Sequence, residues 1–102
     1  MSVVTLTLLA PAALEEQIID LLLAEEPIAR AGFTTQDVRG HGEAAAYKSV
    51  LEQVRGFTRL VEIAVTAPES DIRSLLIGLK EALPDRGIAY RIMPVLTSDV
   101  LR

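Results

Sequence analysis

The sequence predicts an α+β fold, because it contains the same succession of signals twice. A strand-like run at 3–9 is followed by a proline, an apolar helical pattern and a glycine that precedes another strand-like run. A run at 60–65 is followed by the same signals in the same order. Two β-α-β units in 102 residues indicate a single domain, residues 1–102, with a ferredoxin-like βαββαβ sandwich. An additional segment, 40–56, separates the two halves.

The strand at 3–9 alternates threonines with apolar residues, and its apolar side is formed by Val4, Leu6 and Leu8. Pro11 suits an early helical position, where a missing N–H leaves no hydrogen bond unmade. The helix that follows has an apolar stripe formed by Leu14, Ile18, Leu21 and Leu22. Pro27 and Gly32 interrupt this pattern, and a weaker strand is expected at 33–39.

The second half repeats these features from the strand at 60–65, whose apolar side is formed by Val61, Ile63 and Val65. Pro68 opens the second helix. Its apolar stripe consists of Ile72, Leu75, Leu76, Leu79 and Leu83. Pro84 and Gly87 end this helix, and the last strand is expected at 88–96.

The two crossovers are expected to be right-handed, which places both helices on one side of the sheet. The other side then carries apolar side chains among threonines: Thr5, Thr7, Leu60, Ala64, Met93 and Val95. A sheet that is apolar on both faces but has helices for only one needs a second cover. We therefore expect the protein to form oligomers through this open face.

Composition argues against several classes of function. The net charge is −4 and lysine and arginine form no cluster, which argues against nucleic-acid binding. The chain has no cysteine, which excludes disulfides, thiol catalysis and zinc–thiolate sites. The apolar N-terminal run lacks the basic residues of a signal peptide, and no stretch approaches the length of about 18 apolar residues that spans a bilayer. We expect a cytoplasmic protein that does not insert into a membrane.

The segment 40–56 is much longer than the loop of an ordinary hairpin, and loops of this length in compact domains are often functional. Good helix formers run from Glu43 onward, with Val50, Leu51 and Val54 on one side and Tyr47 nearby. One interpretation is a loop that binds a partner protein through Tyr47, Val50, Leu51 and Val54. The alternative is a short helix that packs on its own subunit or on a neighbouring one.

The segment 32–42, GFTTQDVRGHG, is similar to the G-x-T-x-x-x-V-[KR]-G-x-G strand and loop base of the PII-like signal-transduction proteins. The closing strand, GIAYRIMPV at 87–95, resembles the short bacterial branch of that superfamily. The resemblance implies a homotrimer with a T-loop between the second and third strands. It implies clefts between subunits that bind small regulatory ligands, most often adenine nucleotides, and a T-loop that controls a partner such as a membrane transporter. Short members are also similar to proteins encoded beside heavy-metal efflux pumps, which suggests metal homeostasis.

The chain departs from the nucleotide-binding members at two places. Those members carry an Arg-Gln pair after the loop-base glycine, where this chain has Glu43 and Ala44. They also carry a Gly- and Lys-rich phosphate loop before the last strand, where this chain has only 84–87. The ligand is therefore left open between an adenine nucleotide and a divalent metal.

The resemblance and the residue types together give the candidate ligand-binding set Thr34, Arg39, Gly40, His41, Gly42, Arg86 and Gly87. Gly40 and Gly42 permit a close approach of a ligand to the backbone. His41 is the only histidine, and with Glu43 it forms a weak candidate metal site. The alternative is a loop histidine that contacts solvent or a carbonyl.

No catalytic triad, Walker motif or H-E-x-x-H motif occurs in the sequence, so we expect a regulatory protein and not an enzyme. Two other interpretations stay open. One is a divalent-metal-binding trimer of the cation-tolerance type, which would lose metal on His41→Ala. The other is a scaffold trimer without a ligand, which would keep its partner after deletion of residues 43–54.

Overall fold

The computed structural model describes residues 2–42 and 56–102, and within them four strands form one antiparallel sheet. The elements along the chain are β1 (Val3–Pro11), the short 3-10 helix η1 (Ala12–Leu14), α1 (Glu15–Ala24), α2 (Glu26–Ala31), β2 (Thr34–Gly40), β3 (Thr58–Pro68), α4 (Glu69–Ala82) and β4 (Ala89–Pro94). The strands lie in the order β2-β3-β1-β4. The predicted ferredoxin-like βαββαβ fold is confirmed.

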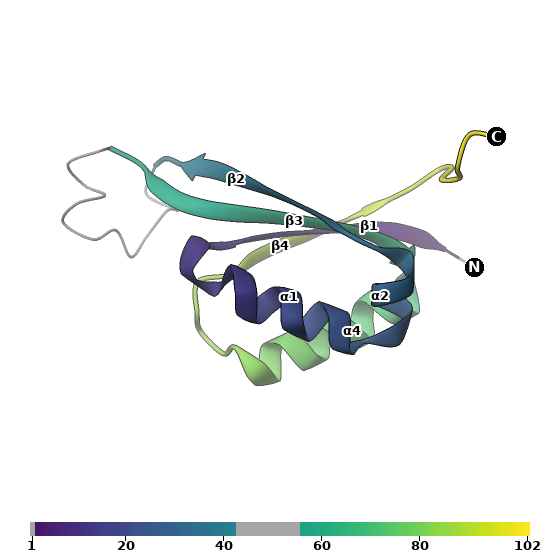
Figure 1. The fold of residues 1–102 in the computed structure, drawn as a ribbon, viewed down its shortest axis with the longest axis horizontal. Coiled ribbons are helices and arrows are strands. Elements are labelled where there is room, and N and C mark those ends of the chain that lie inside the picture. Colours follow the sequence, from purple (N-terminus) through teal and green to yellow (C-terminus); the bar gives the residue numbers. More distant parts are fainter. Residues whose placement is uncertain (1, 43–55) are drawn as a thin grey trace.

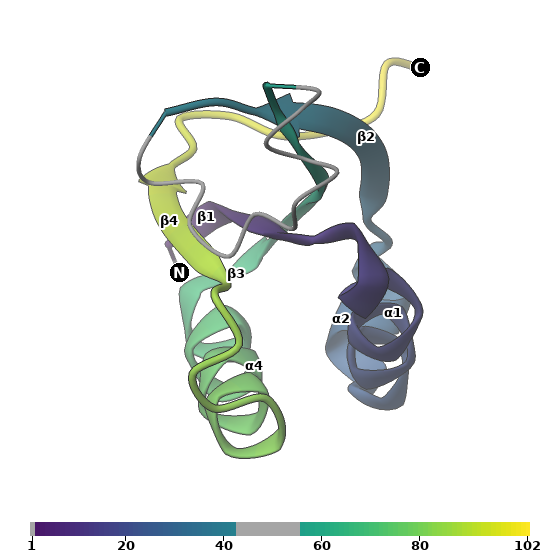
Figure 2. The same cartoon turned by 90° about the vertical axis from the view of Figure 1, so that its left-hand side faces the viewer.

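The helices cover only one face of the sheet (Figure 1). Viewed from the end of the sheet, α4 and the α1–α2 pair lie next to each other below that face (Figure 2). The apolar stripes predicted for the two helices meet the sheet there, since Ile18, Leu22, Ile72 and Leu75 are all buried. On the sheet side the core is formed by alternate residues of the two central strands: Val4, Leu6, Leu8, Val61, Ile63 and Val65.

Two prolines close strands instead of lying inside helices. Pro11 is the last residue of β1 and precedes η1, with φ −53° and ψ 135°. Pro68 ends β3 and caps α4 with nearly the same dihedrals, φ −56° and ψ 142°. Pro68 opens the second helix as expected, as its N-cap, but the expectation that Pro11 is a helical residue was wrong. An extended ψ at the φ fixed by the ring suits a residue that connects a strand to a helix.

The first crossover contains two helices and not one. Glu25 is extended, with φ −91° and ψ 107°, and separates α1 from α2. Pro27 lies in the first turn of α2, where its missing N–H costs no hydrogen bond. Pro27 therefore interrupts the first helix, as expected, but it also opens a second one, which buries Ile28 in the core.

The face opposite the helices carries the residues expected on it. Across the central ladder Thr5 lies opposite Thr66 and Thr7 lies opposite Ala64. The hydroxyl oxygens of Thr5 and Thr66 are 2.7 Å apart and share a hydrogen bond. Other members of this face are Leu9, Leu60, Arg91 and Met93, and the Met93 side chain is 53% exposed. Of the expected residues only Val95 lies beyond the sheet, because β4 ends at Pro94.

Neighbouring leucines of α1 offer a direct test of this packing. Leu22→Ala removes a fully buried side chain, so we expect the free energy of unfolding to fall by about 2–5 kcal/mol. Leu23 is 53% exposed, and Leu23→Ala should change the free energy by no more than about 0.5 kcal/mol. Urea unfolding followed by circular dichroism measures both values, and equal losses would contradict the assigned helix face.

Candidate functional site

The candidate ligand residues lie at the two opposite edges of the sheet. Arg39, Gly40, His41 and Gly42 belong to the end of β2 and the residues after it, whereas Arg86 and Gly87 precede β4. Both groups are at the same end of the molecule, the left side in Figure 1. β2 and β4 are separated by β3 and β1, so roughly 14 Å of sheet lies between them. Within one chain the two groups do not form a single site.

Thr34 lies away from both groups. It begins β2 and pairs with Ala64, whereas Gly40 ends β2 and pairs with Thr58. Thr34 and Gly40 are the two ends of this seven-residue strand, roughly 20 Å apart. Within one chain Thr34 therefore does not form a compact site with the residues after β2.

The glycines at the loop base differ in conformation. Gly42 has φ +89°, a region that other residues rarely adopt, whereas Gly40 is the last residue of β2 and has no positive φ. Gly56 has φ +77°. Two left-handed glycines, Gly42 and Gly56, therefore flank the undescribed residues 43–55. The predicted partner-binding residues Tyr47, Val50, Leu51 and Val54, and the predicted metal ligand Glu43, lie outside the described residues.

Phe57 organises the side chains at the loop base, and sequence reasoning did not single it out. The guanidinium of Arg39 lies 4.9 Å from the centroid of the Phe57 ring, within cation–π range. The ring of His41 lies 6.3 Å from the same ring at an angle of 49°. Arg39 and His41, two of the candidate residues, therefore share the Phe57 ring as a neighbour. This proximity depends on the β2–β3 register, which cannot be read from the sequence.

Arg39 also lies directly opposite Arg59 in the β2–β3 ladder. Directly opposed residues of an antiparallel pair point to the same side of the sheet, and like charges there repel. Neither arginine takes part in the ion pairs of the described residues, which are Arg30–Glu26 and Arg73–Glu69. This end of the β2–β3 ladder therefore carries two adjacent positive charges in a protein of net negative charge.

No described part of the chain brings three potential metal-ligating side chains together. His41 is exposed, and its described neighbours are an arginine and a phenylalanine, which do not ligate metals. The metal site of His41 and Glu43 stays a prediction, because Glu43 lies outside the described residues.

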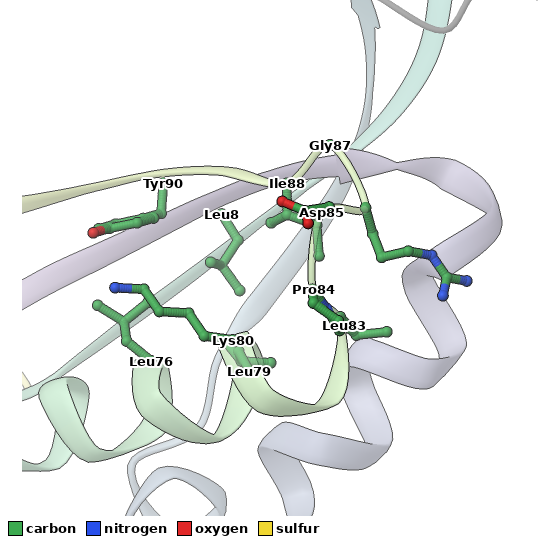
Figure 3. A pocket seen from close by; sticks show the side chains of 11 residues that line it. Leu8, Leu76, Leu79, Lys80, Leu83, Pro84, Asp85, Gly87, Ile88 and Tyr90 are labelled. Atoms are coloured by element: carbon green, nitrogen blue, oxygen red, sulfur yellow. The ribbon is translucent and has the colours of Figure 1, made fainter.

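Arg86 and Gly87 line a cavity of about 520 Å³ between the end of α4 and the start of β4 (Figure 3). Its apolar wall is formed by Leu8, Leu76, Leu79, Leu83 and Ile88. The connecting loop turns around one end of the cavity, with positive φ at Asp85 (52°) and Gly87 (73°). A volume of this size is typical of small-molecule sites. Sequence reasoning predicted Arg86 and Gly87 but not the leucine wall, which comes from β1 and from α4 with its C-cap residue.

Polar side chains lie at the opening of this cavity. The ammonium of Lys80 points toward Tyr90 and is 5.6 Å from the centroid of its ring (Figure 3). Lys80 and Asp85 contribute one positive and one negative charge to this opening, and Arg86 lines the cavity from the loop. The cavity therefore combines an apolar interior with a charged rim.

Among the described residues, none of the helices is long and apolar enough to cross a membrane.

Solved structures with the same fold belong to PII-like proteins. CPII from Thiomonas intermedia K12, a nitrogen regulatory PII-like protein bound to ADP, AMP and bicarbonate, matches with a TM-score of 0.71 and 18% identity, over 99% of this chain and 98% of that one. Arabidopsis thaliana PII bound to citrate matches with a TM-score of 0.68 and 21% identity, over 99% and 82%. The expected resemblance to the PII-like superfamily is confirmed, and at these identities it establishes the fold.

The chain belongs to the DUF3240 family, described as proteins of unknown function, whose model matches residues 1–101. A DUF3240 protein from Shewanella baltica OS155 has a TM-score of 0.79 and 20% identity over 100% of this chain and 99% of that one. No curated protein matches the chain.

The opposed arginines predict an unusual response to substitution. Arg59→Glu replaces a repulsive cross-strand pair by an attractive one, so we expect the free energy of unfolding to rise by about 0.5 kcal/mol. Arg59→Gln should give a smaller gain. Urea unfolding measures both, and the gain of Arg59→Glu should disappear in about 1 M salt, where exposed charges are screened. A loss of stability at low salt would contradict the repulsion.

Proposed function

We propose that this protein is a PII-like regulator that forms a homotrimer, binds a small ligand in the clefts between subunits and controls a partner protein through the segment after Gly42. The proposal treats it as a cytoplasmic protein that signals by binding and does not catalyse a reaction. A membrane transporter or a metal efflux system is the partner class that we favour.

The main support for this proposal is the sheet face opposite the helices. Small or apolar residues of this face, Thr7, Leu9, Leu60 and Ala64, lie beside the charged Glu62 and Arg91. No described element of the same chain covers them. Thr7 is already only 9% exposed in the single chain. Such a surface suits burial against copies of itself, because removing apolar area from water stabilises the assembly by roughly 25 cal/mol per Å².

Assembly also explains why the candidate residues lie at opposite edges of the sheet. The loop base of one subunit, with Arg39 and His41, can approach the Arg86–Gly87 edge or the Thr34 end of a neighbour only in an oligomer. A site built from two subunits couples the ligand to the arrangement of the chains around it. That coupling gives a ligand different affinities for two states of the loop, which regulation requires.

The ligand class follows from the positive charge at the loop base and at the cavity rim. Arg39, Arg59, Lys80 and Arg86 suit an anion, and the fold relatives bind ADP, AMP and bicarbonate in one case and citrate in another. We propose a small anionic ligand for this chain, and an adenine nucleotide is the first to be tested. The loop residues Tyr47, Val50, Leu51 and Val54 are the proposed partner contacts.

The proposed assembly is tested by one charge on the open face. Ala64→Asp places a carboxylate among Thr34 and Thr7, so we expect the oligomer to dissociate into folded monomers. Ser74→Asp makes the same charge change on the exposed side of α4 and should leave the oligomer intact. Sedimentation velocity distinguishes the species and circular dichroism checks folding. A monomeric parent protein at micromolar concentration would contradict the proposed trimer.

The proposed sensing is tested by thermal unfolding with AMP, ADP, ATP, cyclic nucleotides, bicarbonate, citrate and divalent metals. A ligand that binds only the folded state stabilises it by about 2.7 kcal/mol at a hundredfold excess over its dissociation constant. We expect the Ser74→Asp variant to keep this stabilisation and the Ala64→Asp variant to lose it, because the site requires two subunits. A response to metals alone would favour the metal interpretation, and no response to any compound would favour a scaffold.

A further inference from the structure

We propose that the cavity between α4 and β4 binds a small amphipathic carboxylate, with its hydrocarbon body on the leucine wall and its carboxylate at Lys80. This inference rests on the ligand-binding part of the proposed function and gives the chemical class of one ligand. Unlike the cleft between subunits, the cavity is formed entirely by residues of one chain. Its occupation therefore does not depend on the oligomer.

The interior of the cavity determines the body of the ligand. Leu8, Leu76, Leu79 and Leu83 are each less than 10% exposed, and they form the wall together with Ile88. None of these side chains donates or accepts a hydrogen bond. A purine or ribose placed against them would leave polar groups without partners, at a cost of about 1–3 kcal/mol for each group. An alkyl or aryl group has no such cost and gains from burial.

The rim of the cavity determines the charged end of the ligand. Lys80 is exposed on α4, and in Figure 3 its side chain extends over the cavity toward Tyr90. Lys80 and Arg86 take no part in the ion pairs of the described residues, Arg30–Glu26 and Arg73–Glu69. Asp85 opposes an anion, so the carboxylate is assigned to the Lys80 side of the opening, where the lysine side chain extends toward Tyr90 and away from Asp85 (Figure 3). A carboxylate at Lys80 keeps contact with water, because the opening is exposed there.

The size of the cavity excludes larger occupants. At about 520 Å³ the space matches the lower half of the range found for small-molecule sites. A helix or strand of a partner protein requires a groove that continues along the surface, whereas this one is closed at one end by the loop 84–87. A small molecule with one apolar end and one anionic end fits the leucine wall, the lysine at the rim and the volume of the cavity.

The test uses the oligomeric protein as purified and four straight-chain carboxylates of increasing length: acetate, butanoate, hexanoate and octanoate. Isothermal titration calorimetry measures their dissociation constants, and 1-octanol serves as the uncharged probe of the same length. We expect affinity to rise about fourfold for each added methylene, because each one buries apolar area against the wall. Octanol should bind more weakly than octanoate, because it lacks the charge that Lys80 recognises.

Matched variants then locate the carboxylate. Lys80→Gln should weaken octanoate binding by about three- to fivefold, as expected for a partly exposed ion pair, and should leave octanol binding unchanged. Arg73→Gln makes the same charge change on α4 at a residue that does not line the cavity, and should not affect octanoate. Equal effects of the two variants would indicate a general charge effect and overturn the proposal.

The remaining outcomes separate this proposal from the proposed function. Affinity that does not depend on chain length would overturn the leucine-wall site, even if nucleotides stabilise the oligomer. Octanoate binding by the Ala64→Asp monomer but not by the oligomer would mean that a second copy covers the cavity, and would also overturn it. Binding with the expected length dependence, in a protein that no nucleotide or metal stabilises, would support the carboxylate site while removing the nucleotide assignment.

Discussion

β1 is hydrogen-bonded along both of its edges, to β3 on one side and to β4 on the other. Its side chains alternate between two environments, so that Leu6 and Leu8 face the helices while Thr5 and Thr7 lie on the open face. The constraint on this strand is strict, because a shift of the register by one residue would exchange the two sets. The positions of β3 and β4, and through them the loop base and the cavity, depend on this central strand.

The two candidate regions follow from what lies beyond that core. β2 and β3 continue past Val61, the last buried apolar residue of the ladder, and Arg39 pairs with Arg59 in this extension. At the opposite edge β4 begins only at Ala89, after a loop that leaves the last turn of α4 partly uncovered. The first region arises because the β2–β3 pair extends beyond β1, and the second arises because β4 begins late.

The sequence predicts the parts of this fold that follow from periodicity. Leu6, Ile18, Ile63 and Leu75 are buried as their spacing requires, and the order of strands and helices is as expected. Features that depend on a particular backbone conformation or register were not predictable. From the sequence alone, Pro27 is equally consistent with the end of one helix and with the first turn of the next. The pairing of Arg39 with Arg59 follows from the register of a hairpin whose connection is long, and no local turn motif fixes that register.

Of the candidate site, the sequence gives residue types but not their surroundings. Arg86 and Gly87 stand out as a charged residue and a turn former, yet the cavity that they line also needs Leu8, which lies far away in the chain. Phe57 is similarly unremarkable in sequence and becomes informative only when Arg39 lies over its ring. The PII-like resemblance located the loop base correctly between β2 and β3, because the glycines there mark a change of backbone direction that local sequence encodes.

The positions of the first and last strands have a further consequence for protein engineering. The amide of Val95 donates to the carbonyl of Val3 at 3.2 Å, so the start of β1 and the end of β4 lie next to each other, at the opposite end of the molecule from Gly42 and Gly56 (Figure 1). A circular permutant that joins these neighbouring strand ends and opens between Gly42 and Gly56 would retain every ladder of the sheet. In such a chain the segment after Gly42 has one free end and no longer connects β2 to β3. Its contribution to partner recognition can then be measured independently of its role in joining the two strands.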